Sequence, residues 1–344
     1  MKEEKRKIRG LIYVHDSQPG LSRKKHGRGF IYFDEEKGKI SNKKLLQRLK
    51  DLKIPPAWEK VWICKNPSGY IQATGYDNRR RKQYLYHPDW TELSRLEKFR
   101  KLHDFGKALP HIRQEIEKKL EPEGWPREKV LALVLKFMDE KRLRVGNKLY
   151  EEENQTYGLT TLRRKHLTEK AGKILIEYRG KSGKYRKIKV EDPELVRLIK
   201  ESSELPGYEI FRYIDDADKS QRIDSADVNE FLQEITGKDF TSKTFRTWGG
   251  TVLAVEEWES AKEESAGDKR KSLKSVIVKR VAEKLGNTTS IAEQHYIHPY
   301  ILQKISSEDY FYDPPDKQAF STVEKKYLDD YELLVLSMLE HENG

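Results

Sequence analysis

The stretch HPDWTELS, residues 87–94, separates two parts of the chain that differ in composition. The part before it contains aromatic and β-branched runs bounded by Gly, Pro and Asn, a pattern that predicts short strands joined by turns. These runs are GRGFIYFD, KVWICKN, GYIQATGYD and KQYLYHP, and one helical segment, NKKLLQRLKDL, interrupts them. After the stretch, helical patterns dominate. We therefore expect an α+β fold: a small β-rich N-terminal domain over residues 1–90 and a larger, mainly α-helical domain over residues 91–344.

The larger domain is expected to open with two long helices, over roughly residues 91–119 and 126–143. The second helix carries one apolar stripe, made of Val130, Val134, Phe137 and Met138. A small β-hairpin should follow, because KILIEYRG alternates, KSG can turn and KYRKIKV returns. Further helices are expected to start near residues 192, 225, 242, 268, 290 and 322.

The composition favours a polyanionic partner. With 344 residues, the chain is long enough for two domains with sizeable cores. Its 68 Lys and Arg residues exceed its 57 Asp and Glu residues, and the formal net charge of +11 suits nucleic acid above all. The sequence contains no apolar run long enough to span a membrane and no signal peptide. The single cysteine, Cys64, excludes an internal disulfide and fits a reducing compartment.

One acidic segment has the spacing of a calcium-binding loop but lacks essential residues. The segment is DDADKSQRIDSAD, residues 215–227. Such a loop needs glycine at its sixth position and a bidentate glutamate at its twelfth, where this chain has Gln221 and Asp227. We interpret the segment as an acidic turn that caps a helix starting near Ser225. Since the chain also lacks Cys/His clusters and phosphate-cradling glycine loops, we expect no metal site and no cofactor.

Two basic residues lie where they could reach a substrate. Lys181 lies at the tip of the expected hairpin, in GKSG, where its ammonium could enter a groove or donate a proton. Arg144 lies at the C-terminal end of the apolar helix, next to Gly146, which we expect to cap that helix. Each has an ordinary explanation when taken alone, because lysine is common in turns and an arginine at a helix end can pair with carbonyls.

A third basic residue, Arg246, lies in the segment FTSKTFRTWGG. A helix capped near Thr241 or Ser242 would bury Phe245 and Trp248. Because Arg246 lies between these two apolar residues, we expect it near the edge of the buried face. Most helical arginines are solvated, so this position too is uninformative by itself.

The segment NTTSIAEQHYIHPYIL, residues 287–302, presents a tyrosine, Tyr296. Ser290 followed by Glu293 is a capping-box pattern, which predicts a helix starting near Ile291 with Tyr296 on its second turn. The apolar residues that could anchor this helix are Ile291, Ile297 and Leu302. The ordinary role of such a tyrosine is that of a half-buried aromatic.

Together, these segments supply an ordered set of residues that suits metal-free phosphodiester transfer. The set is Arg144, Lys181, Arg246, Asn287 and Tyr296. Two arginines can stabilise the charge on the phosphoryl oxygens of the transition state in place of a magnesium ion. A tyrosine can form a covalent phosphotyrosine, and a lysine can protonate the leaving 5′-oxygen. Because the covalent bond conserves the energy of the phosphodiester, resealing would need no ATP.

The chain resembles the type IB DNA topoisomerases of the compact poxvirus and bacterial kind, from about IPPAW at residue 54 to Tyr296. The motifs that carry the resemblance are GYDNRRRKQYLYHP, LRVGNKLYEEENQTYGLTTLRRKHL, YRGKSGKYR, KTFRTWGG and NTTSIAEQHY. It implies an enzyme whose two domains close as a clamp around duplex DNA. Such an enzyme nicks one strand through a 3′-phosphotyrosyl intermediate, lets supercoils relax by strand rotation and religates, without ATP or a metal ion.

The resemblance also implies a role for each residue of the set. Arg144 and Arg246 would stabilise the transition state, and Lys181 would be the general acid. Asn287 would contact a nonbridging phosphate oxygen, and Tyr296 would be the nucleophile. The poxvirus enzymes have histidine where this chain has Asn287. An amide can donate a comparable hydrogen bond but cannot carry positive charge, so we expect activity at a lower or less pH-dependent rate.

The segment NRRRKQYLYHP interleaves cationic residues with two tyrosines. The cationic residues are Arg79, Arg80, Arg81 and Lys82. Strand alternation would put Tyr84 and Tyr86 on one face beside this cluster. In the family that the chain resembles, the residues matching Gln83, Tyr84 and Tyr86 face the DNA major groove, and the one matching Tyr150 touches the backbone near the cut. Arg81 and Lys243 are further candidate DNA contacts, and packing within the sheet is the alternative role for the two tyrosines.

Two other functions remain as alternatives. A tyrosine site-specific recombinase uses nearly the same set, but it normally shows His-x-x-Arg, where this chain has Lys243 three residues before Arg246, and it begins with a helical domain. An architectural DNA-binding protein would explain the charge but not the ordered set. We therefore expect a monomeric enzyme that acts on double-stranded DNA. Its compactness suggests a bacterial cytoplasmic protein associated with the nucleoid.

Overall fold

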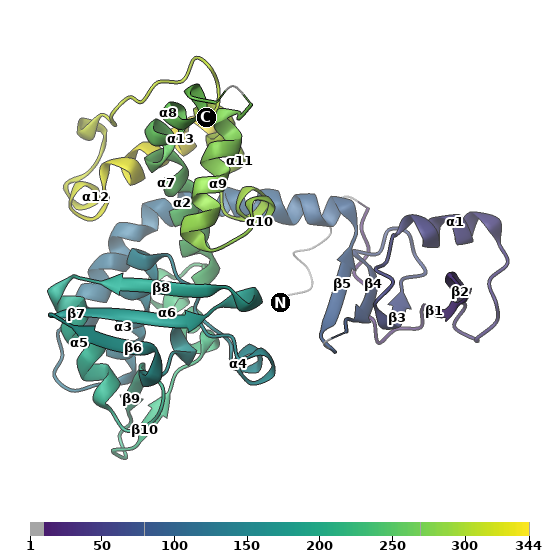
Figure 1. Ribbon diagram of the computed structural model, residues 1–344, viewed down its shortest axis with the longest axis horizontal. Coiled ribbons are helices and arrows are strands. Elements are labelled where there is room, and N and C mark those ends of the chain that lie inside the picture. Colours follow the sequence, from purple (N-terminus) through teal and green to yellow (C-terminus); the bar gives the residue numbers. More distant parts are fainter. Residues whose placement is uncertain (1–9, 79, 269, 344) are drawn as a thin grey trace. The chain divides into compact units, whose positions relative to one another are not determined.

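The structure is a computed structural model that describes residues 10–78, 80–268 and 270–343, with the backbone alone for Leu149, Tyr150 and Asn343. Two compact units make up the chain: the first ends at Lys98 and the second begins at Phe99. Figure 1 traces the elements of both units. The fold is α+β, as predicted, with one sheet in the first unit and mostly helices, accompanied by smaller sheets, in the second.

The first unit is built on a five-stranded antiparallel sheet in the order β2-β1-β3-β4-β5. Its strands are β1 (Leu21–His26), β2 (Gly29–Phe33), β3 (Glu59–Ile63), β4 (Ile71–Tyr76) and β5 (Lys82–Tyr86). The four strands expected from the sequence are present. Strand β1 was not predicted, because its sequence, LSRKKH, has no aromatic or β-branched residue. Its pairing with both β2 and β3 holds it in the sheet.

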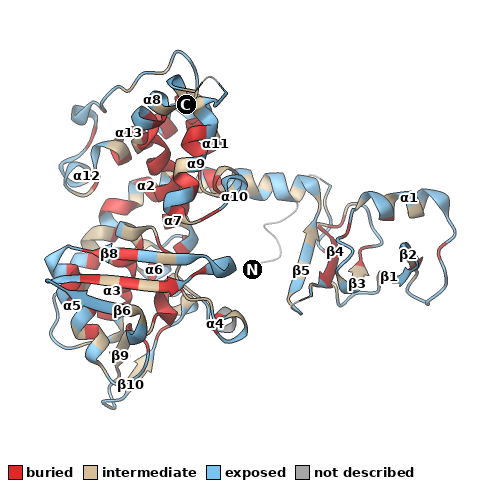
Figure 2. Cartoon of the chain, viewed as in Figure 1, coloured by how far each residue is buried: buried red, intermediate tan, exposed pale blue. Residues whose placement is uncertain are grey.

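One helix packs with this sheet. Helix α1 (Lys43–Asp51) matches the expected helix, and it begins after Asn42, whose side-chain oxygen accepts a hydrogen bond from the Leu45 amide (3.0 Å). The core of the unit consists of Leu21, Tyr32, Ile40, Leu49, Ile54, Val61, Ile63 and Ala73. Strand β4 is buried over its first five residues, as Figure 2 shows, whereas β5 alternates between exposed and half-buried residues.

Helices form most of the second unit. They are α2 (Pro88–Leu120), which includes the boundary between the units, α3 (Arg127–Lys141), α4 (Lys148–Asn154), α5 (Pro193–Glu204), α6 (Ser225–Thr236), α7 (Ser242–Glu256), α8 (Trp258–Ala266), α9 (Leu273–Leu285), α10 (Thr289–His295), α11 (Pro299–Ile305), α12 (Thr322–Tyr327) and α13 (Asp330–Asn343). Helix α3 contacts α5, α6, α7 and strand β9 (Arg212–Ile214), so it is surrounded by other elements.

The burial of α3 is more complete than its sequence pattern predicted. The four residues of the expected apolar stripe are fully buried. Leu131, Leu133 and Leu135, which lie outside that stripe, are fully buried as well. A helix that is apolar on all sides is one that packs on all sides. The end of α3 is therefore a rigid starting point for the loop that follows it.

The expected hairpin is present as β7 (Lys173–Arg179) and β8 (Tyr185–Val190). A strand that was not predicted, β6 (Leu167–Lys170), completes a three-stranded sheet in the order β6-β7-β8. Ile174, Ile176 and Tyr178 alternate along β7 and are buried in the core of the unit. The tip of the hairpin is therefore carried by a strand whose inner face is fixed.

The helix expected near residue 268 is α9, which starts at Leu273 after the N-cap Ser272. Helix α8, which precedes it, was not predicted. The reason is that α8 buries only Trp258 and Ala261, so its sequence shows no apolar periodicity. Helices α11 and α13 were also not predicted. Both belong to the buried core through Ile301, Leu302, Ile305 and several residues of α13.

The acidic segment at 215–227 begins with the turn, residues 215–219, of a hairpin made by β9 and β10 (Ser220–Arg222), and it ends in the first turn of α6. The Asp215 carboxylate accepts hydrogen bonds from the amides of Ala217 (3.0 Å) and Lys219 (2.9 Å), and Asp224 is the N-cap of α6. The segment is therefore an acidic turn followed by a helix cap, as predicted. Within the described residues, no three His, Cys, Asp or Glu side chains are grouped so as to hold a metal ion. None of the described helices combines the length and apolar character that crossing a membrane requires.

Candidate active site

Tyr296 lies at the C-terminal end of α10, where it is the C-cap residue. The helix begins at Thr289, two residues before the predicted start at Ile291. The prediction that Ser290 caps it is wrong, because the hydroxyl of Thr288 already accepts a hydrogen bond from the amide of Ile291. Tyr296 is therefore not on the second turn of a longer helix but at the point where the helix stops.

The apolar residues expected to anchor this helix divide into two groups. Ile297 and Leu302 are buried, but they lie after α10, and Leu302 belongs to α11. Ile291 is 41% exposed and anchors nothing. Tyr296 is consequently held by the chain that follows it and by a neighbouring helix rather than by an apolar face of α10.

That neighbouring helix is α7, and a glycine allows the close approach. A Cβ atom added to Gly250 would lie 2.5 Å from the carbonyl oxygen of Tyr296 and 3.0 Å from its Cβ. Gly250 and Arg246 are four residues apart and therefore lie on the same face of α7. The face that receives the backbone of Tyr296 thus also presents Arg246 to it. The second glycine of the TWGG motif has this packing role.

Arg246 is more deeply buried than predicted, with only 3% of its surface exposed. Its Nη1 donates to the carbonyl of Arg142, and its Nη2 donates to the carbonyl of Leu285 (3.0 Å). Its Cζ lies 5.0 Å from the centroid of the Tyr296 ring. Burial, with repulsion from Arg144, lowers the pKa of Arg246 to about 10, so the group still carries its charge at neutral pH. The cap at Thr241 and the burial of Phe245 and Trp248 are as predicted.

The pKa of Tyr296 reflects a competition between burial and positive charge. Burial alone would raise the pKa of the phenol, because an anion is disfavoured away from water. The guanidinium groups of Arg246 and Arg144 outweigh burial, with a smaller contribution from Lys243, and the pKa falls below its ordinary value. The site therefore favours ionisation of this hydroxyl group, as a nucleophile requires.

Arg144 lies in a loop rather than at the end of a helix. Helix α3 ends at Lys141, and Arg142 caps it in the left-handed conformation (φ 53°). The prediction that Gly146 caps the helix is therefore wrong. The left-handed turn at Arg142 reverses the chain, and the carbonyl of Arg142 accepts from Arg246.

A second segment supports the loop that carries Arg144. The amide of Leu159 donates to the Arg144 carbonyl (3.0 Å), and the amide of Thr160 donates to the Val145 carbonyl (2.7 Å). Two glycines make this contact possible, since a Cβ on Gly158 would lie 2.5 Å from the Cα of Gly146. The backbone of Arg144 and Val145 is thus held by two hydrogen bonds next to a close glycine contact.

Asn287 joins Arg144 to the region of Tyr296. It follows Gly286, which ends α9 in the left-handed conformation (φ 63°), and it is 8% exposed. Its Oδ1 accepts a hydrogen bond from Nη2 of Arg144. Its Nδ2 is buried and makes no hydrogen bond with any residue that the structure describes. A buried amide donor without a partner is costly, and a substrate oxygen would satisfy it.

Lys181 lies at the tip of the β7–β8 hairpin, in a short 3-10 turn over Lys181–Gly183, and is exposed. Ser182 (φ 64°) and Gly183 (φ 74°) adopt the left-handed conformation that makes the tip tight. No hydrogen bond or ion pair joins the Lys181 ammonium to the residues that the structure describes. Arg144 thus contacts Asn287, Arg246 contacts Tyr296, and both arginines act electrostatically on Tyr296. The hairpin that carries Lys181 reaches this group through Lys184, which donates to the carbonyl of Asn287.

Tyr178 is a further residue of this region that the sequence analysis did not single out. It is 5% exposed, and burial raises the pKa of its hydroxyl although Arg186, Arg144 and Arg246 lie close enough to oppose that rise. The alternation of KILIEYRG places Tyr178 on the same face as Ile174 and Ile176, so its inward direction could have been inferred. Arg186 is its cross-strand neighbour in the β7–β8 hairpin. Its proximity to Arg144 and Arg246 could not be inferred, because these two residues belong to distant segments.

In the first unit, Tyr84 and Tyr86 lie on one face of β5, as predicted. They are 44% and 40% exposed, and their rings stack with centroids 6.0 Å apart. Lys82 lies beside them, with its Nζ 5.6 Å from the Tyr84 ring, but its ammonium is also paired with Asp16 (2.6 Å). Both rings are therefore partly accessible to a partner. If their role were only to pack within the sheet, we would expect them to be buried.

The other candidate DNA contacts are arranged differently. Gln83 points to the opposite face of β5 and donates to Asp77 (3.0 Å), so it does not share the face of the two tyrosines. Arg81 is paired with the same carboxylate (2.6 Å). Lys243 is exposed on the first turn of α7. Arg79 and the side chain of Tyr150 lie outside the described residues.

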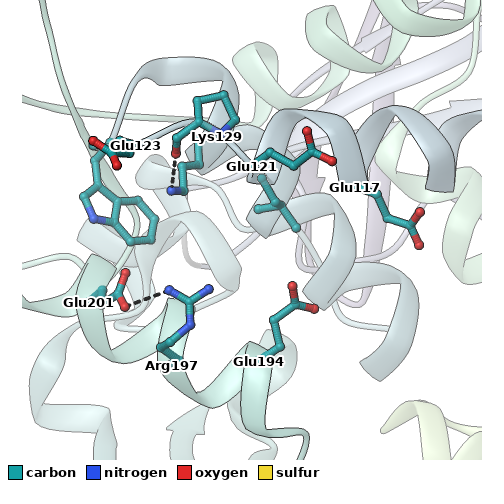
Figure 3. Close-up of a pocket in the computed structure, with 11 residues that line it drawn as sticks. Glu117, Glu121, Glu123, Lys129, Glu194, Arg197 and Glu201 are labelled. Atoms are coloured by element: carbon teal, nitrogen blue, oxygen red, sulfur yellow. Dashed lines mark hydrogen bonds and ion pairs between the residues drawn. The ribbon is translucent and has the colours of Figure 1, made fainter.

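Two cavities in the second unit lie elsewhere. A cavity of about 550 Å³ is surrounded by Glu117, Leu120, Glu121, Pro122, Glu123, Gly124, Trp125, Lys129, Glu194, Arg197 and Glu201 (Figure 3). Another of about 390 Å³ lies between α4, α6 and β10. None of the five candidate catalytic residues lines either cavity.

Two family models match the chain. Residues 87–311 match the model described as eukaryotic DNA topoisomerase I, catalytic core, and residues 29–77 match the model described as bacterial DNA topoisomerase IB, N-terminal domain. The first match contains all five candidate catalytic residues. The second covers most of the sheet of the first unit.

Whole proteins with similar sequences carry related names. The chain is 30% identical over 300 residues to DNA topoisomerase 1B of Acanthamoeba polyphaga mimivirus, which covers 85% of this chain and 89% of that protein. It is 23% identical over 284 residues to DNA topoisomerase 1B of vaccinia virus (strain Copenhagen), covering 79% and 85%. It is 28% identical over 166 residues to DNA topoisomerase 1 of Candida albicans, covering 47% of this chain and 20% of that protein.

Proposed function

The chain belongs to the type IB DNA topoisomerases, and from this premise we propose that it relaxes supercoiled duplex DNA without ATP or a metal ion. One strand is cut and its 3′ end is held by the protein. The free 5′ end rotates about the intact strand, and the same bond is then resealed. The single observation that carries the proposal is the contact between Arg246 and Tyr296, because it places a group that is cationic at neutral pH beside a phenol whose pKa is lowered despite its burial.

In the proposed cutting step, the Tyr296 oxygen attacks the phosphorus of one phosphodiester. A 3′-phosphotyrosyl bond forms as the bond to the 5′-oxygen breaks, and the phenol proton is lost to solvent. Lys181 gives a proton to the leaving 5′-oxygen. Resealing reverses these transfers: the 5′-hydroxyl attacks the phosphotyrosine, and Tyr296 leaves. The number of phosphodiester bonds is conserved, so no nucleotide hydrolysis is required.

Arg144 and Arg246 stabilise the pentavalent transition state, in which negative charge spreads over the nonbridging oxygens. Arg246 is supported for this role by the two backbone carbonyls that fix its guanidinium and by the shielding of that group from water. Arg144 is oriented by Asn287. Because both groups are held before substrate arrives, little reorganisation is needed during the reaction.

Asn287 serves two partners with the two ends of its amide. Its Oδ1 holds Arg144, and its unpaired Nδ2 donates to a nonbridging oxygen. The side chain of histidine has no carbonyl oxygen, so a neutral imidazole could serve both partners only through its two ring nitrogens. The asparagine therefore adds an orienting contact to Arg144 while it gives up the option of a positive charge.

Outside the reacting centre, we propose that Tyr84 and Tyr86 contact DNA bases with their exposed rings, and that Lys243 contacts a phosphate. Gln83 and Arg81 can join them only after leaving Asp77. The two units would close around the duplex as a clamp, and the net charge of +11 would attract it. We further propose that the protein works as a monomer at the bacterial nucleoid. The match to the model of a bacterial N-terminal domain supports the proposal that the protein is bacterial.

The first unit counts against the recombinase alternative. A recombinase begins with a helical DNA-binding domain, whereas the first unit is built on a five-stranded sheet, most of which matches a topoisomerase domain model. An architectural protein does not account for the contact of Arg246 with Tyr296.

Relaxation of a supercoiled plasmid in EDTA and without ATP tests the proposal. We expect a ladder of topoisomers that converges on the relaxed form. A recombinase would give no ladder on a plasmid without its sites, and a DNA-binding protein would only retard the plasmid. Relaxation that required magnesium ions or ATP would contradict the proposed mechanism.

A further inference from the structure

The C-terminal end of α9 gathers three cationic side chains from two other elements. Arg186 donates a hydrogen bond to the carbonyl of Lys284 (3.3 Å), and Arg246 donates to that of Leu285 (3.0 Å). Lys184 donates to the carbonyl of Asn287, two residues after the helix ends (2.7 Å). The last carbonyls of a helix lack partners within the helix, and the helix dipole makes that end negative. The end of α9 is therefore a natural receptor for cations, and here it receives both the candidate catalytic Arg246 and two residues of the hairpin.

Lys184 is the contact nearest to the hairpin tip. The amide of Gly180 donates to the carbonyl of Lys184 (2.8 Å), and the amide of Gly183 donates to the carbonyl of Gly180 (3.0 Å). Lys181 lies inside the turn that these two bonds close. Because the turn is closed at Lys184, fixing the Lys184 side chain restricts where Lys181 can be.

The two strands of the hairpin have further attachments where they enter and leave the turn. On β7, the carbonyl of Arg179 accepts from the amide of Tyr157 (2.8 Å). On β8, Arg186 lies so close to Gly286 that a Cβ added there would lie 2.2 Å from its Nη1. These attachments hold the ends of the two strands, and Lys184 is the attachment of the turn itself, which carries Lys181.

We propose that Lys184 is a positioning residue for the general acid, which docks the hairpin tip on the carbonyl of Asn287 and so holds the Lys181 ammonium at the leaving 5′-oxygen. The proposal rests on the function proposed above. Asn287 then connects three parts of the site: its Oδ1 orients Arg144, its Nδ2 faces the substrate, and its carbonyl receives the hairpin. Lys184 itself touches no reacting atom.

The test compares two substrates in single-turnover cleavage: a duplex with the ordinary 5′-bridging oxygen at the cut and one with sulfur in its place. A thiolate leaves without a proton, so a defect that acts through the general acid disappears on sulfur. For Lys184→Met we expect cleavage of the oxygen substrate to be about 10- to 100-fold slower, as for loss of a hydrogen bond to a charged group, and cleavage of the sulfur substrate to be near the unaltered rate. Lys184→Arg, which can still reach the carbonyl, should recover most of the oxygen rate.

The matched control is Lys187→Met, which removes a lysine of the same hairpin, on β8, that is paired with Glu177 (3.5 Å) and not with α9. It should leave both rates unchanged, which excludes a general effect of hairpin charge. Equal slowing of both substrates by Lys184→Met, or no slowing at all, would overturn the positioning role. Lys181→Ala run alongside tests the underlying function separately: if sulfur fails to rescue Lys181→Ala, the acid assignment itself is wrong, whatever Lys184 does.

Discussion

The Arg246 guanidinium lies against the ring of Tyr296, with its Cζ 5.0 Å from the ring centroid, although fifty residues separate the two (296 − 246). Two backbone carbonyls hold the guanidinium, and the close approach at Gly250 holds the tyrosine on the same face of α7. The pair is therefore preassembled in the absence of DNA, so the contribution of each side chain can be measured separately.

Tyr296→Phe should abolish DNA relaxation and leave noncovalent DNA binding nearly unchanged. The substitution removes only the attacking oxygen, and the ring that packs against Arg246 stays. Denaturation during the reaction should trap DNA on the unaltered protein and none on the variant, which a gel under denaturing conditions measures. A covalent adduct that persisted in the variant would identify another nucleophile.

Arg144→Ala and Arg246→Ala should each slow cleavage by at least about 10²–10³-fold, the usual cost of losing one donor to a transition-state oxyanion. Affinity for a short duplex should change little, because both groups act mainly in the transition state. Unlike Lys181→Ala, both variants should remain slow on the sulfur substrate, since charge stabilisation is needed with either leaving group. An effect of tenfold or less at either position would make that arginine structural.

Arg246→Met should raise the pKa of Tyr296. In the folded protein burial pushes this pKa upward, and Arg246 is the largest of the charges that push it below its ordinary value, so removing the charge lets burial dominate. The ring carbons of labelled tyrosine, followed by NMR through an alkaline titration, report the change, with Tyr296→Phe identifying the signal. Arg197→Met, which removes an exposed arginine of α5, should leave that titration unmoved; an unchanged midpoint in Arg246→Met would show that Arg246 does not set the pKa.

Gly250→Ala should impair cleavage and destabilise the fold by about 1–3 kcal/mol, the range for overpacking a tight contact. Its Cβ would meet the carbonyl oxygen and the Cβ of Tyr296, neither of which can rotate away, so the nucleophile must shift. Gly267→Ala is the control, because the nearest atoms to a Cβ there are at ordinary contact distances of 3.7 and 3.9 Å. Thermal unfolding and single-turnover cleavage measure the two effects. Normal cleavage by Gly250→Ala would mean that this contact does not position Tyr296.

The elements that could be predicted from the sequence are those with a local physical signal. The β7–β8 hairpin follows from alternation around a tight turn, and the start of α7 follows from its capping residue and the spacing of Phe245 and Trp248. Elements without such a signal were not predicted: β1 has no strand-forming residue, and α8 has little apolar periodicity. Cap positions were also uncertain, as Thr288 and Arg142 show, because several neighbouring residues can satisfy the same helix end.

The sequence by itself determined which chemical groups the site contains and their order along the chain, since two arginines, a lysine, an amide and a tyrosine can be recognised by type and motif. Only the tertiary structure decided how they act on one another. The burial of Arg246 depends on carbonyls of Arg142 and Leu285, and the orientation of Arg144 depends on Asn287, 143 positions away. The pKa of Tyr296 falls only because these cations meet around it. Electrostatic interactions depend on distance through space and on burial, and neither can be read from positions along a chain.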